Sequence, residues 1–334
     1  MKLVVQIPCF NEERTLAQTI ADVPRRIAGV DEVEILVVDD GSSDATLDVA
    51  RRAGADHIVR HKRNRGLARA FRTALDNSLR IGADIIVNTD ADNQYSGAGI
   101  PRLIQPILEG EADIVVGDRE THKLDRLSGT NKMLQSVGSR VVRMMSDLDV
   151  PDAVSGFRAM SRDAALQLNV LSSFSYTIEM LVQAGQKRLC VRAVPVATNP
   201  ATRESRLFSS VPQFIERSAT TLLRIYTMYR PLRVFLLLGL ALGVVGALPI
   251  ARFLYAYFTE GGAGHIQSLV LGGVLVMIGI MICVAGIIAD LIGFNRQLIE
   301  STLEKVRAIE LSIENGSARG SQDRPAGSIP SRPK

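Results

Sequence analysis

Ile85-Ile86-Val87-Asn88-Thr89-Asp90-Ala91-Asp92-Asn93-Gln94 is the stretch that decides the fold of this chain of 334 residues. An apolar, strand-like run gives way to a loop that carries two carboxylates one residue apart, Asp90 and Asp92. In open α/β sheets, ligands bind beyond the carboxyl ends of the strands. Oxygen ligands of this kind suit Mg²⁺ or Mn²⁺, with substrate phosphates completing the coordination. The stretch therefore predicts a metal-diphosphate site, and an ordinary solvated turn is the alternative.

Strand-like and helical segments alternate on both sides of this stretch. Short apolar runs predict strands at 3–7, 34–38, 57–59, 113–116 and 189–196. Helices are expected between them, at about 13–27, 65–81, 101–108 and 130–146, with another that stops near Gly54. Alternation of this kind predicts an α/β fold with a mostly parallel sheet covered by helices on both faces.

The composition changes near residue 232. Segments 232–258 and 266–292 are almost uncharged, and each exceeds the roughly 20 apolar residues that cross a bilayer. A pair of buried core helices is the alternative, but such helices are seldom apolar all round. The loop between the segments lacks Lys and Arg, whereas Arg230, Arg233 and Arg296 flank the outer ends. The positive-inside rule then predicts a cell-membrane protein with the globular part and both termini in the cytoplasm.

The remaining segments complete a domain plan. The plan has a globular domain at 1–210, an interfacial amphipathic helix at 211–231, the hairpin at 232–292, a charged helix at 293–315 and a disordered tail at 316–334. The formal net charge is +4, and the basic residues gather near the hairpin. Attraction to anionic membrane lipids is therefore expected, and nucleic acid is not. The three cysteines are far apart and predict neither a disulfide nor a metal site.

Four motifs occur in order along the chain. They are Ile7-Pro8-Cys9-Phe10-Asn11-Glu12, Val38-Asp39-Asp40-Gly41-Ser42-Ser43-Asp44, Asp90-Ala91-Asp92-Asn93-Gln94 and Ser155-Gly156-Phe157-Arg158. Over about 1–296 the chain resembles a family 2 glycosyltransferase, in particular the polyprenyl-phosphate glycosyltransferases related to dolichyl-phosphate mannose synthase, of the bacterial type with two C-terminal membrane helices. This resemblance implies a GT-A fold and inverting transfer from a nucleotide-sugar donor, preferably a UDP-sugar, to polyprenyl phosphate. It also implies Mg²⁺ or Mn²⁺ and a homotetramer.

The resemblance also implies roles for individual residues. Nucleotide-sugar binding falls to Pro8, Asn11, Glu12, Asp39, Asp40 and Asp90, and the metal site to Asp90, Asp92 and Gln94. Residues expected around the acceptor phosphate are Arg119, Lys132, Ser136 and Ser205. Catalytic roles are expected for Asp92, Asp152, Arg203 and Arg206. Phe10 stands where the family usually has Tyr, which removes one hydroxyl from the nucleotide pocket.

The chemistry of the acceptor bears on the role of Asp152. A phosphate monoester with a second pKa of about 6 is largely dianionic at neutral pH, so its oxygen needs little help from a base. We therefore expect Asp152 to orient rather than to accept a proton, although relatives suggest a base there. Tyr176 and Glu179 are candidates for reading the hydroxyls of the sugar, but no spacing rule identifies that sugar.

Three other functions compete with this hypothesis. A processive polysaccharide synthase needs a polymer channel, which two helices cannot enclose, and its Gln-x-x-Arg-Trp signature is excluded because the chain has no Trp. A non-catalytic membrane protein that binds a nucleotide-sugar would not need both acidic motifs. A glycoside hydrolase uses paired carboxylates on either side of the scissile bond and no metal at a strand end.

Overall fold

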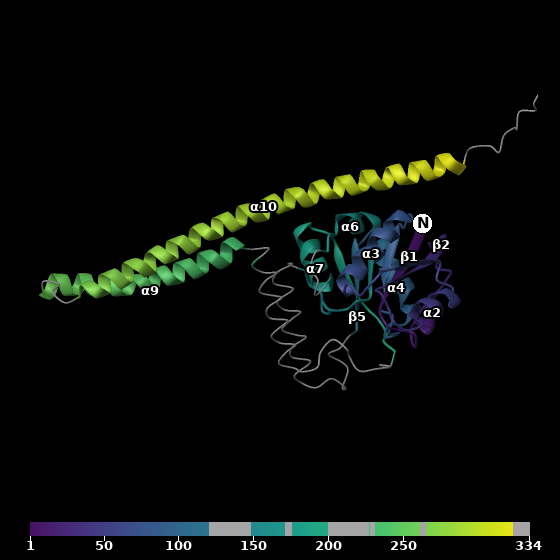
Figure 1. Ribbon diagram of the computed structural model, residues 1–334, viewed down its shortest axis with the longest axis horizontal. Helices are drawn as coiled ribbons and strands as arrows, with labels where there is room; N and C mark the ends of the chain where they lie inside the picture. Colours follow the sequence, from purple (N-terminus) through teal and green to yellow (C-terminus); the bar gives the residue numbers. More distant parts are fainter. Residues whose placement is uncertain (120–147, 171–175, 200–226, 228–230, 261–264, 323–334) are drawn as a thin grey trace, which may run out of the picture. The chain divides into compact units, whose positions relative to one another are not determined.

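The computed structural model describes residues 1–119, 148–170, 176–199, 227, 231–260 and 265–322 (Figure 1). The chain divides into two compact units. The first consists of Met1–Ile215 together with Leu303–Lys334, and the second is Glu216–Thr302. In this division the C-terminal end of the last helix belongs with the globular part.

A seven-stranded sheet forms the centre of the first unit, in the order β3-β2-β1-β4-β6-β5-β7. The strands are β1 Lys2–Cys9, β2 Glu32–Asp39, β3 His57–Arg60, β4 Ile85–Asn88, β5 Ile114–Asp118, β6 Arg158–Ser161 and β7 Val191–Pro195. All neighbouring strands are parallel except β6, which is antiparallel to both β4 and β5. The predicted mostly parallel sheet is thus confirmed, with one antiparallel strand that the apolar pattern did not predict.

Helices pack against both faces of this sheet. One face carries α1 Leu16–Ala21, α2 Thr46–Arg52 and α4 Ile100–Leu108, which follows the short 3₁₀ helix η1 Gly97–Gly99. The other carries α3 Leu67–Arg80, α6 Arg162–Gln167 and α7 Tyr176–Gln186. Along β1, Leu3, Val5 and Ile7 belong to the core of the first face, while Val4 between them is equally buried. Burial on both faces explains why β1 is an unbroken apolar run.

Two predicted helices differ from the structure or lie outside it. Helix α1 ends at Ala21, well before the expected residue 27. Pro24 accounts for the early end, because the residue before a proline is disfavoured in helical conformation. The helix expected at 130–146 lies outside the described residues, as does almost all of the predicted interfacial helix at 211–231.

The second unit contains α9 Pro231–Glu260 and the first part of α10 Ile266–Gln322, which run side by side in Figure 1. Both helices are long and apolar enough to cross a membrane. They approach closely at glycines: a Cβ added to Gly239 would lie 2.6 Å from the carbonyl oxygen of Gly279, and one added to Gly246 would lie 2.9 Å from that of Gly272. Small residues permit such approach between membrane helices. A Cβ added to Gly243 or to Gly273 would meet no atom within 4 Å.

The C-terminal part of α10 packs within the first unit. Arg307 forms an ion pair with Asp76 of α3, and Glu310 lies 3.1 Å from Arg80 at the end of the same helix. The charged helix expected at 293–315 is therefore continuous with the second apolar helix. It also reaches Gln322, beyond residue 316 where the disordered tail was expected to begin.

Candidate active site

The sheet register brings several motif residues to one edge. Asn88 at the end of β4 pairs with Arg158 at the start of β6, and Val116 of β5 pairs with the same residue. Because β6 is antiparallel to both neighbours, the loop before it emerges where β4 and β5 end. Three segments consequently meet at the carboxyl edge of the sheet: the loop after β4, the residue after β5 and the segment 152–157.

Asp90 lies against the loop before β6. A Cβ added to Gly156 would lie only 2.6 Å from Asp90 Oδ2, so this position requires a glycine if the carboxylate is to stay in place. Burial, together with the charge of Asp92, raises the pKa of Asp90 to about 6. A bound cation would stabilise the charged form of this Asp90 carboxylate.

Asn93 and Gln94 extend the acidic loop. Asn93 has a positive φ of 57°, and its side-chain Oδ1 is buried without a hydrogen-bond partner among the described residues. Two carboxylates and an unpartnered amide oxygen form a hard donor set, which fits Mg²⁺ or Mn²⁺ with phosphate oxygens as further ligands. Within the described ranges no group of three His, Cys, Asp or Glu side chains could hold a metal without such help.

The chain after β7 is docked on the same loop. Asn199 donates its backbone N–H to the carbonyl of Gln94 at 2.8 Å and its side-chain N–H to the carbonyl of Asn93 at 3.0 Å. Thr198 forms an isolated β-bridge with Tyr95. The segment that leads toward Arg203 is therefore anchored beside the acidic loop.

Asp39 and Asn11 lie at the ends of β2 and β1. Asp39 is fully buried; its Oδ1 accepts the Ser42 N–H at 2.9 Å, and its Oδ2 lies 3.3 Å from Arg60 Nε but has no hydrogen bond among the described residues. Asn11 has a positive φ of 55°, and its Oδ1 accepts the Ser43 N–H at 2.9 Å. The unsatisfied Asp39 oxygen is an acceptor for a donor group of a ligand, since buried polar atoms normally have partners.

Pro8 and Glu12 are buried near these two residues, at the end of β1 and just after it. The Glu12 N–H donates to Thr46 Oγ1 at 2.8 Å, and Glu12 Oε2 accepts from Thr15 Oγ1 at 3.1 Å. Glu12 thus ties the loop after β1 to the start of α2.

Asp40 follows Asp39 in the chain but makes hydrogen bonds to a different loop. Its carboxylate accepts the N–H groups of Arg65 at 3.0 Å and Gly66 at 2.8 Å, and it lies 2.6 Å from His61 Nδ1. Asp40 therefore holds the loop between β3 and α3. This contact was not predicted, because the residues involved are separated by about 25 positions in the chain.

Arg119 and Asp152 form a two-point ion pair. Arg119 Nε donates to Asp152 Oδ2 at 2.6 Å, and Nη2 donates to Oδ1 at 3.0 Å. Burial alone would lower the pKa of Arg119, but the nearby Tyr95, Asp152 and Asp90 outweigh it and raise that pKa. The sequence placed these two residues in separate roles, and the structure joins them.

Arg158 is a fully buried cation that holds the loop before β6. Its guanidinium donates to the carbonyls of Ser155 at 2.8 Å, Ala153 at 2.7 Å and Thr177 at 2.7 Å. Burial lowers its pKa to about 10, so it remains charged at neutral pH. The motif analysis quoted Arg158 but gave it no role.

Tyr176 and Glu179 point into the protein. Tyr176 is 3% exposed, its hydroxyl accepts from Asn88 Nδ2 at 3.1 Å, and its ring stacks on Phe71 at 4.2 Å. Glu179 is 1% exposed. Whether these side chains read the hydroxyls of a sugar therefore stays a prediction. Among the other predicted site residues, five lie outside the described part of the chain: Lys132, Ser136, Arg203, Ser205 and Arg206.

The sequence of the globular unit is similar to those of known proteins. The sequence profile described as "Glycosyl transferase family 2" matches residues 4–168. The undecaprenyl-phosphate mannosyltransferase of Micrococcus luteus is 31% identical over 61% of this chain and 85% of its own length. The UDP-N-acetylglucosamine–dolichyl-phosphate N-acetylglucosaminyltransferase of Methanococcus voltae is 29% identical over 58% of this chain and 83% of its own.

Solved structures support the fold. Glucosyl-3-phosphoglycerate synthase from Mycobacterium tuberculosis, in complex with Mn²⁺, UDP-glucose and phosphoglyceric acid, superposes with a TM-score of 0.54. The match has 21% sequence identity and covers 68% of this chain and 79% of the other. A likeness at this level of identity shows a common GT-A fold. It does not show that the two proteins share a substrate. From the profile match, the sequence relatives and the converging strand-end motifs we conclude that this chain belongs to glycosyltransferase family 2.

Proposed function

We propose that the protein transfers a sugar from a nucleotide-sugar, preferably a UDP-sugar, to polyprenyl phosphate with inversion at the anomeric carbon. The observation that carries this proposal is the convergence of Asp90, Gly156 and the Arg119–Asp152 pair at one sheet edge. The acidic pair would bind a metal-diphosphate, and the buried guanidinium of Arg119 would bind a second phosphate. The two would lie on either side of one loop. Relatives named for undecaprenyl phosphate and dolichyl phosphate support the acceptor class.

The donor side is proposed to lie over β1, β2 and β4. Asp39 Oδ2 would accept a hydrogen bond from the base or the ribose, since it is buried and unsatisfied. Asp90, Asp92 and Gln94 would hold Mg²⁺ or Mn²⁺, with Asn93 Oδ1 as a further oxygen. The bound metal supplies charge neutralisation for the departing diphosphate. Complexes of the M. tuberculosis fold neighbour with UDP and either Mn²⁺ or Mg²⁺ support this choice of ligands.

The acceptor side is proposed to begin at Arg119. Its guanidinium is oriented by Asp152 and carries a charge that the pair cannot easily lose. Lys132, Ser136 and Ser205 remain proposed partners of the acceptor phosphate. Arg203 follows the docked Asn199 by four residues in the sequence. Arg203 and Arg206 are therefore proposed to neutralise phosphate charge beside the acidic loop.

The proposed reaction requires no proton transfer from the acceptor. An oxygen of the dianionic acceptor phosphate attacks the anomeric carbon, the bond from that carbon to the donor diphosphate breaks, and the nucleoside diphosphate leaves with the electron pair. Two anions must approach each other, so the contribution of Arg119 and the other basic residues is orientation and charge stabilisation. The two apolar helices would anchor the enzyme in the membrane that contains the polyprenyl tail, with both termini in the cytoplasm. A homotetramer is part of the same proposal.

The reaction is tested by a transfer assay. Membranes containing the protein receive radiolabelled UDP- and GDP-sugars one at a time, with polyprenyl phosphate and Mg²⁺ or Mn²⁺, and the lipid phase is extracted. Label in that phase from one donor would establish both the reaction and the sugar. A folded protein that yields no labelled lipid and binds none of the nucleotide-sugars would refute the proposal.

Exchanging Asp92 to Asn tests the acidic pair directly. We expect transfer to fall at least a hundredfold, because a neutral amide cannot balance the charge of the metal. Asp163→Asn is the matched control, since Asp163 is an exposed carboxylate in the first turn of α6 and should leave transfer unchanged. Normal metal dependence in Asp92→Asn would remove Asp92 from the metal site.

A further inference from the structure

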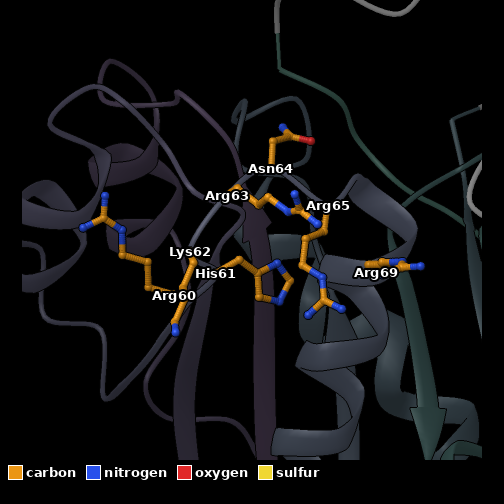
Figure 2. A pocket seen from close by; sticks show the side chains of 7 residues that line it. All are labelled: Arg60, His61, Lys62, Arg63, Asn64, Arg65 and Arg69. Carbon is orange, nitrogen blue, oxygen red and sulfur yellow. The ribbon is translucent and has the colours of Figure 1, made fainter.

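The two ends of the proposed donor site are held by different kinds of contact. At the nucleotide end, the basic pocket at the end of β3 (Figure 2) is joined to β2, since Arg60 lies 3.3 Å from Asp39. At the metal end, the Asp90 carboxylate lies against Gly156, where an added Cβ would meet Oδ2 at 2.6 Å. The position of Asp90 therefore depends on how the Gly156 peptide is held.

Side chains hold the Gly156 peptide from both sides. Its N–H donates to the hydroxyl of Tyr95 at 3.2 Å, and its carbonyl accepts from Asn88 Nδ2 at 2.8 Å. Asn88 precedes Asp90 by two residues and Tyr95 follows it by five, so both belong to the segment that carries the carboxylate. The two hydrogen bonds thus fix the spacing between the acidic loop and the loop before β6 at the point where Asp90 lies against Gly156.

Both of these side chains have fixed positions. Tyr95 is 3% exposed, and its ring stacks on Phe157 with the ring centroids 5.1 Å apart. Asn88 is fully buried, and its Oδ1 accepts from Gln6 Nε2 at 3.0 Å. The acceptor and the donor that they offer to Gly156 are therefore held in place by packing and by further hydrogen bonds.

Other contacts fix the residues on either side of Gly156. Arg158 donates to the carbonyl of Ser155 at 2.8 Å, and the carbonyl of Phe157 accepts a backbone N–H of β5 at 2.8 Å. The course of the loop before and after the glycine thus does not depend on Tyr95. The glycine itself has wide conformational freedom because it lacks a Cβ. The contribution of the Tyr95 hydroxyl is therefore to restrain the rotation of one peptide.

We infer that Tyr95 is a positioning residue of the metal site, which acts through the Gly156 peptide on the Asp90 carboxylate. The inference rests on the proposed function, because it takes Asp90 as a ligand of the metal-diphosphate. Only a glycine leaves room for this carboxylate, yet glycine is also the least restrained residue in the backbone. The hydroxyl of Tyr95 supplies the missing restraint. It keeps the carboxylate oriented before a cation binds, and such preorganisation raises affinity.

The test removes only the hydroxyl. Tyr95→Phe keeps the ring that stacks on Phe157 and deletes the acceptor for the Gly156 N–H. Mn²⁺ is titrated by calorimetry into the full chain in detergent with UDP present, and UDP is titrated separately in the presence of a chelator. We expect the Mn²⁺ affinity to fall about three- to tenfold, which corresponds to one hydrogen bond. The affinity for UDP without metal should stay unchanged.

Ser161→Ala is the matched control. It also deletes a hydroxyl that accepts a backbone N–H, that of Ala164 at 3.2 Å, but at the other end of β6. It should leave the Mn²⁺ affinity unchanged, although it removes the N-cap of α6 and lowers the stability of the fold. An equal loss of Mn²⁺ affinity in Ser161→Ala and Tyr95→Phe would overturn the inference, as would a parallel loss of metal-free UDP binding in Tyr95→Phe.

A double-mutant cycle tests whether Tyr95 acts through Gly156. Because Gly156→Ala already displaces Asp90, adding Tyr95→Phe should weaken Mn²⁺ binding by less than about twofold further. Additive losses would mean that Tyr95 acts by another route, and would overturn the inference. If the unsubstituted protein bound UDP but no Mn²⁺, the metal site of the proposed function would be refuted together with this inference. The inference alone would be refuted if the unsubstituted protein bound Mn²⁺ and Tyr95→Phe bound it equally well.

Discussion

Asp152 directs both of its carboxylate oxygens to the guanidinium of Arg119, at 2.6 Å and 3.0 Å. Asp152 is 5% exposed, so this pair is largely removed from water. Transfer of a proton to this carboxylate would break the ion pair and leave a buried cation without its partner. The geometry favours a positioning role for Asp152, acting through Arg119 on the acceptor phosphate.

Asp152→Asn is expected to raise the KM for polyprenyl phosphate ten- to a hundredfold, because a hydrogen bond to a charged group contributes about 1.5–3 kcal/mol. The pH dependence of kcat should keep its shape, since no catalytic ionisation is lost. Steady-state kinetics across pH would measure both quantities, with Asp163→Asn as the control. Loss of one limb of the pH profile with an unchanged KM would instead identify Asp152 as the base.

Gly156→Ala is expected to displace the Asp90 carboxylate, since the added methyl group would lie 2.6 Å from Oδ2. Mn²⁺ affinity should fall at least tenfold when measured by calorimetry in the presence of UDP. Gly99→Ala is a matched control, because its Cβ would make an ordinary contact at 3.4 Å with Phe157. Equal Mn²⁺ affinity in the two variants would show that Gly156 does not hold the carboxylate.

The pKa of about 6 at Asp90 predicts a pH-dependent stability without metal. Between the unfolded value near 4 and the folded value near 6, the native state binds more protons than the unfolded state, so stability falls as pH rises through this window. The loss at Asp90 should be about 3 kcal/mol, which Asp90→Asn would abolish. Denaturant unfolding with chelator at several pH values would measure it. If the free energy of unfolding changed with pH in the same way in the unsubstituted protein and in Asp90→Asn, the raised pKa of Asp90 would be contradicted.

Two ion pairs link α10 to α3 and differ in burial. Side chains of the Arg80–Glu310 pair are about half exposed, whereas those of Arg307 and Asp76 are 20% and 37% exposed. Double-mutant cycles with Ala should give about 1 kcal/mol or more for Arg307 with Asp76, and below about 0.5 kcal/mol for the exposed pair. The exposed pair serves as the internal control. Equal coupling energies would mean that burial does not decide the strength of this contact.

The sequence predicted the strand ends well because buried parallel strands are apolar runs, and a polar motif after such a run must lie at the carboxyl edge. Strand β6 was missed because its first residue is an arginine. Arg158 is tolerated there only because carbonyls of Ser155, Ala153 and Thr177 converge on it. The apolar pattern does not reveal hydrogen bonds of this kind, although two of the three carbonyls lie within five residues of Arg158. The hydrogen bond between Tyr176 and Asn88 was not predicted either, since the two residues lie 88 positions apart in the chain.

The antiparallel course of β6 also separates the two halves of the proposed site along the chain. Donor motifs belong to β1, β2 and β4, whereas Arg119 and Asp152 stand at the two ends of one continuous insertion between β5 and β6. Both ends of that insertion are fixed by the sheet and by the ion pair that joins them. Its interior can therefore change in length and composition while the nucleotide pocket stays intact. A protein built in this way can vary the Arg119–Asp152 part of the proposed acceptor site within one contiguous stretch of gene, while the donor motifs of β1, β2 and β4 stay as they are.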